Sequence, residues 1–275
     1  MAEYMVEIKN VTKEFRVYKK NVQRLLHELL GLNQGKVLAA LSDINLTAAK
    51  GECILLMGST GAGRTTLLKL IAGILAPTTG TVEVHGRTNH MVSMSAGFDN
   101  ELTGLQNMKL KGALLGYTKD ELKEKEQAII ELAGLKEVIG KPLKSMPPGS
   151  SSRLGFAMTV MQDPDILLLD EPFLVGGRIP RSKIVEKLQE LKNEGKTIIL
   201  TTSSWTEGAQ ICDRAVLLDH GTIACEGTFK DARKKYLEID AATHMHSTRK
   251  KEKQEEQEEI ETTRDDWQEP TDIDM

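Results

Sequence analysis

Apolar and polar positions alternate along the chain in a way that predicts short strands separated by longer helices. Short apolar or β-branched runs predict strands at Val6–Val11, Ala40–Leu46, Cys53–Met57, Thr81–His85, Asp165–Leu169, Thr197–Thr201 and Ala215–Leu218. Helical periodicity predicts helices at Thr65–Ile74, Leu105–Leu115, Lys119–Ala133, Ser151–Gln162, Arg181–Asn193 and Lys230–Ile239. Strands that alternate with helices in this order predict an α/β fold.

Two segments depart from this alternation. Asn21–Leu32 (NVQRLLHELLGL) interrupts a β-rich start with an amphipathic helical pattern. Such a helix either packs on the surface of the domain or contacts a membrane partner, and the pattern leaves both open. Beyond Thr243 the chain is densely charged and has few apolar residues, which is typical of a disordered segment. We therefore expect one folded domain over residues 1–242 and a solvated tail over 243–275.

The charge of the chain is concentrated in that tail. The whole chain has a formal net charge of −4, and from Ser247 onward 11 acidic and 5 basic side chains give −6. The remainder therefore carries −4 − (−6) = +2. Because a nearly neutral body lacks the basic surface that phosphate backbones require, we expect no nucleic-acid partner.

The sequence gives no sign of a membrane-spanning or secreted protein. The start, MAEYMVE, is acidic, and the longest apolar runs have strand length, well short of the roughly 20 residues that span a bilayer. We expect no direct span and membrane contact only through a partner. The 3 cysteines lack metal-ligand spacing, as in a reducing compartment. His244 and His246 form a pair in the tail, without further ligands nearby, and are expected to be solvated.

The sharpest local signal is GSTGAGRTT, residues 58–66, between a predicted strand and a predicted helix. That is the placement of a P-loop, where glycines turn backbone N–H groups toward phosphates and the helix N-terminus adds positive potential. Thr65 has the hydroxyl position that reaches Mg²⁺. Arg64 replaces the expected lysine by a wide, planar guanidinium. The candidate phosphate-binding residues are Gly58, Ser59, Thr60, Gly61, Ala62, Gly63, Arg64, Thr65 and Thr66.

A second signal is the apolar strand that ends in Asp170-Glu171-Pro172. In nucleotide hydrolases of this kind, the first carboxylate holds Mg²⁺ and the second polarises the attacking water. A buried strand that merely ends in acidic residues is the alternative. That alternative is disfavoured because the motif lies about a hundred residues after a P-loop.

Four stretches together resemble the ATPases of ABC transporters: Gly58–Gly86, Ala96–Gly116, Arg153–Pro172 and Cys212–Gly221. The resemblance covers roughly residues 5 to 240. AGFDNELTG, RLGFA and the inserted N-terminal helix are similar to the subfamily that exports O-antigen, teichoic acid or capsule polysaccharides. The resemblance implies a P-loop NTPase core, an antiparallel β portion at the start and a helical subdomain near Leu105–Gln162.

The resemblance also implies a mechanism and partners. ATP and Mg²⁺ would bind the P-loop, Phe15 would stack on adenine, with Tyr18 as a second candidate, and Glu171 would activate water. In the family, two ATPase subunits enclose ATP between the P-loop of one and the signature loop of the other. A second ATPase subunit, as a homodimer or paralogue heterodimer, and a membrane permease subunit are therefore implied. The chain would act at the cytoplasmic face of the cell membrane.

Several positions depart from the family pattern. The signature loop is Met146–Ser150, where Pro147 replaces the serine, Pro148 lacks a backbone N–H and Gly149 is retained. Ser150–Ser152 offer hydroxyls that partly substitute for the missing donors. Ser203 stands at the switch-histidine position and can donate a hydrogen bond, but it has no imidazole. The segment Val175–Arg178 lacks the aspartate that is usual there.

These departures leave three functions open. The chain is a working exporter ATPase, a nucleotide-binding regulatory or scaffold subunit with impaired catalysis, or the ATPase of another ABC transporter type such as an importer. A cytosolic ABC protein acting on chromosomes or ribosomes would need a coiled-coil insertion or a second nucleotide domain. Only one copy of each motif occurs here. The sequence does not identify the transported glycan.

Overall fold

The computed structural model describes residues 4–17, 36–91, 97–175, 179 and 181–243. The chain forms two compact units, Met1–Ala232 and Arg233–Met275. The boundary between them precedes the predicted domain boundary at residue 242. The predicted helix Asn21–Leu32, Tyr18 and the charged tail with its histidine pair lie outside the described residues.

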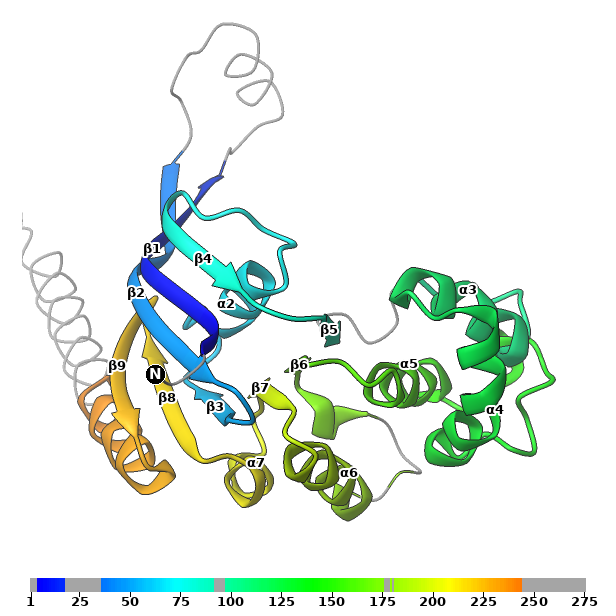
Figure 1. The fold of residues 1–275 in the computed structure, drawn as a ribbon. Coiled ribbons are helices and arrows are strands. Elements are labelled where there is room, and N and C mark those ends of the chain that lie inside the picture. The colour runs from blue at the N-terminus through cyan, green and yellow to red at the C-terminus, as the bar shows by residue number, and fades with distance from the viewer. Residues whose placement is uncertain (1–3, 18–35, 92–96, 176–178, 180, 244–275) are drawn as a thin grey trace, which may run out of the picture. The chain divides into compact units, whose positions relative to one another are not determined.

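The larger unit contains two sheets, shown in Figure 1. The first is antiparallel, with the order β2-β1-β4, and comprises β1 (Tyr4–Val17), β2 (Lys36–Ala49) and β4 (Thr79–Val84). The second has the order β5-β6-β7-β3-β8-β9 and comprises β3 (Cys53–Met57), β5 (Thr88–Met91), β6 (Ile166–Asp170), β7 (Thr197–Thr201), β8 (Arg214–Asp219) and β9 (Thr222–Gly227). Within the second sheet only the β8–β9 pair is antiparallel.

The core forms between the two sheets. Helix α2 (Arg64–Ile71) contacts β2 and β4 of the first sheet and β6 and β7 of the second. Its buried residues Leu67, Leu68, Leu70 and Ile71 join one apolar cluster with residues from both sheets. All of β3 is buried, in keeping with its continuous apolar sequence, because a parallel strand covered on both faces meets no water.

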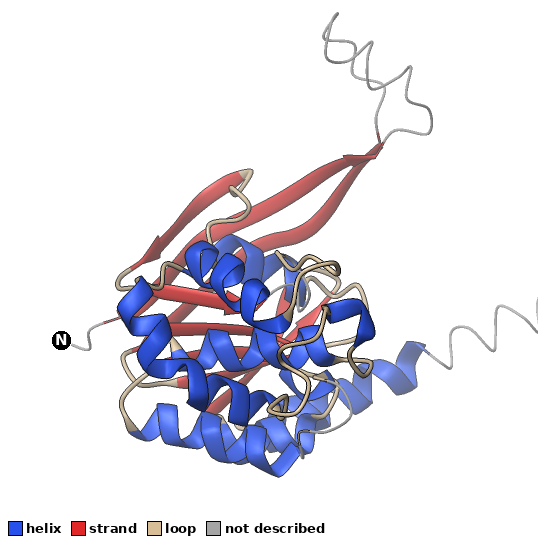
Figure 2. Ribbon diagram, turned by 90° about the vertical axis from the view of Figure 1, so that its right-hand side faces the viewer, coloured by secondary structure: helices blue, strands red, loops and turns tan. Residues whose placement is uncertain are grey.

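The antiparallel sheet extends at one end as a two-stranded ribbon (Figure 2). Strand β1 pairs with β4 between Val6 and Thr12, whereas its pairing with β2 continues to Val17. The distal residues of the ribbon are largely exposed, and Phe15 lies among them, opposite Leu38. The two strands are longer than predicted. The apolar pattern did not include their distal residues, because these residues lack a buried face.

Helices α3 (Gly104–Leu115), α4 (Lys119–Ala133) and α5 (Ser150–Met161) form the helical subdomain. They enclose a second apolar cluster that includes Met108, Ile129 and Leu154. A short 3₁₀ turn, η1 (Leu143–Ser145), precedes α5. The antiparallel β portion and the helical subdomain, both predicted, are confirmed.

The remaining elements frame the second sheet. A 3₁₀ turn, η2 (Pro172–Leu174), follows β6, and α6 (Arg181–Asn193) contacts both that turn and α7 (Trp205–Ile211). Helix α7 in turn contacts β3. Residues 229–243 are helical. The pattern analysis did not predict β5, β9 or α7. The four-residue β5 and the seven-residue α7 are too short for a periodic signal to develop, and β9 (TIACEG) has neither a continuous apolar run of strand length nor a strict alternation.

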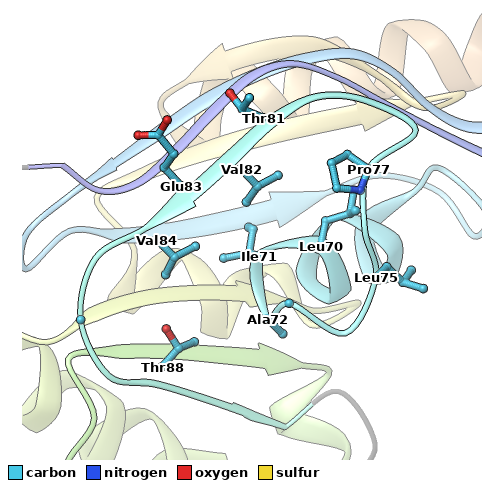
Figure 3. Close-up of a pocket in the computed structure, with 12 residues that line it drawn as sticks. Leu70, Ile71, Ala72, Leu75, Pro77, Thr81, Val82, Glu83, Val84 and Thr88 are labelled. Atoms are coloured by element: carbon cyan, nitrogen blue, oxygen red, sulfur yellow. The ribbon is translucent and has the colours of Figure 1, made fainter.

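A hollow of about 650 Å³ lies between the end of α2 and β4. Figure 3 shows Val82 and Val84 of β4 beside Ile71 of α2, and Glu83 is the only titratable residue in the lining. A largely apolar lining with one carboxylate does not suit phosphate binding. Among the described residues, no helix is both long and apolar enough to cross a membrane.

The first turn of α3 offers a test of the helical subdomain. Thr103 caps α3: its hydroxyl accepts from the Gln106 N–H at 3.2 Å, and the Gln106 side chain accepts from the Thr103 N–H at 2.8 Å. We expect Thr103→Ala to lower the free energy of unfolding by about 1 kcal/mol in denaturant titrations, because half of the capping box is lost. The control Lys109→Ala, on the exposed face of α3, should change it by less than about 0.5 kcal/mol. Equal losses in both variants would contradict this role of the cap.

Candidate active site

The candidate site lies where β3, β6 and β7 end. These strands are parallel and β7 lies between the other two, so their carboxyl ends meet at one edge of the sheet (Figure 1). The P-loop follows β3, the Asp170-Glu171 pair ends β6, and Ser203 follows β7. The topology therefore brings together three segments that are far apart in the sequence.

Two glycines fix the path of the P-loop. Gly58 has φ 143°, and a Cβ there would lie 2.4 Å from the carbonyl oxygen of Leu218. Gly63 has φ 106°, and a Cβ there would lie 2.6 Å from Leu41 Cδ2. Both positions combine a left-handed backbone with a close neighbour, which only glycine tolerates. The Cβ position of Gly61 instead meets no atom within 4 Å, so the crest of the loop is open.

Helix α2 begins directly after Gly63, so its first turn lies at the open side of the loop. Gly63 is the N-cap of α2 and makes no side-chain capping hydrogen bond. The N–H groups of a first helical turn have no partners within the helix, so they suit an anion. The predicted phosphate-binding residues Ser59, Thr60, Ala62 and Thr66 belong to the same loop and turn.

Asp170 is held by two hydroxyl groups. Thr65 Oγ1 donates to Asp170 Oδ2 at 2.8 Å, and Thr201 Oγ1 donates to Asp170 Oδ1 at 2.5 Å. The structure thus joins the two predicted magnesium ligands, Thr65 and Asp170. Thr201 was not predicted. Its sequence signal was its place at the end of β7, where it is the register partner of Asp170.

These oxygens fit a magnesium ion that arrives with phosphates. Mg²⁺ prefers oxygen ligands and is commonly bound by one or two carboxylates together with substrate phosphates and waters. Thr65 and Asp170 supply one hydroxyl and one carboxylate. Within the described part of the chain, no group of three or more His, Cys, Asp or Glu side chains could hold a metal on its own.

Glu171 has an unusual backbone and a well-bound carboxylate. Its φ of 51° and ψ of 50° place it in the left-handed region, which is uncommon for a residue other than glycine. Its N–H donates to the Thr201 carbonyl at 3.0 Å. Ser203 donates twice to Glu171 Oε2, from its N–H at 2.8 Å and from its hydroxyl at 3.1 Å. The two predicted catalytic residues, Glu171 and Ser203, are therefore in direct contact.

Arg64 reaches the other carboxylate oxygen of Glu171. Its Nη1 lies 3.6 Å from Glu171 Oε1 and 3.4 Å from the Thr202 carbonyl oxygen. The side chains of Arg64 and Glu171 are 17% and 20% exposed, respectively. The guanidinium therefore extends from the P-loop to the residues that follow β6 and β7, where its charge faces the Glu171 carboxylate.

The signature-loop residues belong to a different part of the fold. Gly149 has φ 78° and is the N-cap of α5 in the helical subdomain. Ser150 donates its hydroxyl to the Pro147 carbonyl at 2.6 Å and accepts from Arg153 Nη2 at 3.0 Å. The Ser150 hydroxyl, expected to replace a missing donor, thus already donates its proton to a carbonyl within the loop. No hydrogen bond among the described residues joins Gly149 to the P-loop.

Phe15 lies on the β1–β2 ribbon, opposite Leu38. The residue is 36% exposed, and Lys13 Nζ lies 5.2 Å from the ring centroid. Lys13 is the register partner of Leu41, the residue whose side chain approaches Gly63. The Phe15 ring therefore has the Lys13 ammonium over one face, and its strand pairs with the part of β2 whose Leu41 approaches the P-loop.

Residues 176–178, where the family has an aspartate, lie outside the described residues.

Two groups with shifted pKa values lie where β5 meets the helical subdomain. Burial lowers the pKa of Lys111 on α3, and burial together with the nearby Lys111 charge lowers the pKa of His90 on β5. Lys111 Nζ lies 5.8 Å from the ring centroid of Phe98. These residues are not among those that form the phosphate cradle.

The sequence matches known proteins over most of its length. The family model described as ABC transporter matches residues 41–174. The "ABC transporter protein AbcA" of Aeromonas salmonicida is 35% identical over 227 residues, which are 82% of this chain and 74% of that protein.

Two relatives are each named "Teichoic acids export ATP-binding protein TagH". That of Bacillus anthracis is 34% identical over 86% of this chain and 43% of its own length. That of Levilactobacillus brevis is 36% identical over 86% of this chain and 65% of its own length. The chain thus spans less than two thirds of these two relatives.

Solved structures share the fold. A dimeric ATP-binding cassette in a post-hydrolysis state, bound to ADP and Pi, superposes with a TM-score of 0.68 at 21% identity, covering 82% of this chain and 99% of that one. An ATP-binding subunit of an ABC transporter gives 0.67 at 20% identity, covering 84% and 93%.

The two loop glycines with different surroundings provide a test of the cradle. Without nucleotide, Gly58→Ala should lower the free energy of unfolding by about 3 kcal/mol, because the methyl group collides with the Leu218 backbone and φ is positive. Gly61→Ala, also at positive φ but in open space, should cost about 1 kcal/mol. Denaturant unfolding of both variants measures the difference. Equal stability losses would contradict the close approach of Gly58 to β8.

Proposed function

Because this chain belongs to the ABC transporter family, we propose that it is the ATP-binding subunit of an exporter of a cell-surface polysaccharide or teichoic acid. The protein would bind MgATP, pair with a second ATPase subunit and drive a membrane permease from the cytoplasmic face of the membrane. Export is favoured over import because two of the similar proteins are named for teichoic acid export.

The observation that carries nucleotide binding is the Thr65–Asp170 hydrogen bond beneath the glycine cradle. Thr65 lies in the first turn of α2, whose N–H groups face the open loop, and Asp170 ends the neighbouring β6. A hydroxyl and a carboxylate at this distance can hold Mg²⁺, which when bound neutralises charge on the nucleotide phosphates. The loop N–H groups and Arg64 would bind the phosphates, and Phe15 would stack on the base.

Glu171 is the group proposed to orient and activate the attacking water. It follows the magnesium ligand Asp170 directly, and its carboxylate lies on the Arg64 side of the cradle. Ser203 would hold the carboxylate in place through its two hydrogen bonds, one from its backbone N–H and one from its hydroxyl. We propose that hydrolysis is slow, because removing one donor to a transition-state anion costs about a hundredfold or more in rate.

The second subunit would complete the site with its own signature loop. Gly149 is proposed to contact the nucleotide of the partner rather than that of its own chain. Pro147 and Pro148 offer fewer donors there than the family pattern, and the Ser150 hydroxyl is engaged within the loop. A homodimer would therefore carry two weakened sites. In a heterodimer with a paralogue, one site would contain the P-loop of this chain and the other site its signature loop.

A second candidate function is nucleotide binding without hydrolysis, in a regulatory or scaffold subunit of the same exporter. The contact of Arg64 with Glu171 favours it, because this contact occupies the group that must act on water. The glycine cradle, Thr65 and Asp170 would still bind MgATP.

The test is MgATP turnover by the purified chain together with its permease, beside Glu171→Gln and a binding titration. We expect measurable turnover that falls at least about a hundredfold in Glu171→Gln, with ATP binding retained. Turnover that is equal in the two proteins would come from a contaminant and would contradict the role of Glu171. Binding without turnover would select the regulatory function, and absence of binding would refute both.

A further inference from the structure

Arg64 contacts one anion of the protein and belongs to the loop that is proposed to bind a second anion, a nucleotide phosphate. Its guanidinium lies 3.6 Å from Glu171 Oε1, while its backbone begins the helix that faces the phosphate cradle. A lysine carries a compact ammonium, whereas the guanidinium presents five N–H donors in a planar fork. A guanidinium at this position can therefore pair either with Glu171 or with a nucleotide phosphate in the cradle.

We propose that Arg64 is a displaceable clamp on Glu171: its ion pair restrains the carboxylate until a nucleotide phosphate takes the guanidinium over. The proposal rests on the proposed nucleotide binding and adds a regulation of the same site. Nucleotide binding and release of Glu171 become coupled, because Arg64 forms a strong ion pair with only one of the two anions at a time.

The occupancy of the Glu171 carboxylate supports the restraint. Ser203 uses two acceptor positions on Oε2, and Arg64 faces Oε1. A carboxylate has about four acceptor positions, so about one remains for water. Withdrawal of Arg64 would leave Oε1 free, while the two Ser203 bonds would still fix the orientation of the group.

The lengths of the Arg64 contacts make the clamp reversible. Both are long, 3.6 Å to Glu171 and 3.4 Å to the Thr202 carbonyl, and both side chains of the ion pair are partly exposed. Such pairs are weak. Bidentate bonds from arginine to phosphate are shorter, at about 2.7–2.9 Å, and roughly twice as strong as neutral hydrogen bonds. A phosphate in the cradle should therefore win the competition.

Competition predicts a coupling between Arg64 and Glu171 in nucleotide affinity. We would measure Mg²⁺-ADP binding by calorimetry on the full chain, since ADP separates binding from turnover. Glu171→Gln keeps the shape of the side chain but removes its charge, so it should raise ADP affinity about three- to tenfold. In an Arg64→Ala background the same change should have no effect. The matched control Glu83→Gln, in the apolar hollow beside β4, should leave affinity unchanged.

The result that overturns the clamp is an equal effect of Glu171→Gln in both backgrounds, or no effect when Arg64 is present. An equal effect would indicate general electrostatics of the site, and no effect would mean that the ion pair does not compete with phosphate.

A second measurement keeps the clamp testable if ADP does not bind, an outcome that would refute the proposed function. We would measure the unfolding equilibrium constant without nucleotide for four proteins: wild type, Arg64→Ala, Glu171→Gln and the double variant. The equilibrium constant of the double variant should differ about two- to fivefold from the value that the two single changes predict together. Additive changes would overturn the clamp, whatever the outcome for nucleotide binding. Arg64→Lys, which keeps the charge, should retain part of the coupling and guards against a folding defect in Arg64→Ala.

Discussion

The parallel register of β3, β6 and β7 is the constraint on which the candidate site depends. These three apolar strands are parallel and adjacent, so their carboxyl ends lie at the same edge of the sheet. Their ends place the P-loop, Asp170 and Ser203 within hydrogen-bonding networks that no single segment could form. The apolar core thus determines where the polar chemistry occurs, and α2, packed between the sheets, is aimed by the same packing.

The departures from the family pattern affect one another. Ser203, at the switch-histidine position, binds Glu171 through both its backbone and its hydroxyl. Arg64, at the lysine position, approaches the same carboxylate from the opposite oxygen. Glu171 itself has a left-handed backbone, a conformation that costs on the order of 1–3 kcal/mol and that its neighbours must maintain. Two departures that lie far apart in the sequence therefore both contact one side chain, Glu171.

Much of this architecture could be predicted from the sequence. Continuous apolar runs located β3 and β7 with their observed bounds, and helical periodicity located α4. Short polar elements such as β5 were not predicted, because four residues are too few to show a periodic pattern of apolar positions. The Thr65–Asp170 contact followed from motif spacing, whereas Thr201 required the strand register. The ion pair of Arg64 with Glu171 could not be predicted, since it depends on how far a flexible side chain reaches across a folded site.

The central claim is that this edge of the sheet binds MgATP through Thr65 and Asp170. The most direct measurement is a calorimetric titration of the purified chain with ATP, in the presence of Mg²⁺ and in the presence of a chelator. The account predicts tighter binding with Mg²⁺ in the wild type and loss of that advantage in Asp170→Asn. ATP affinity that is the same with and without Mg²⁺, or an undiminished Mg²⁺ advantage in Asp170→Asn, would contradict it.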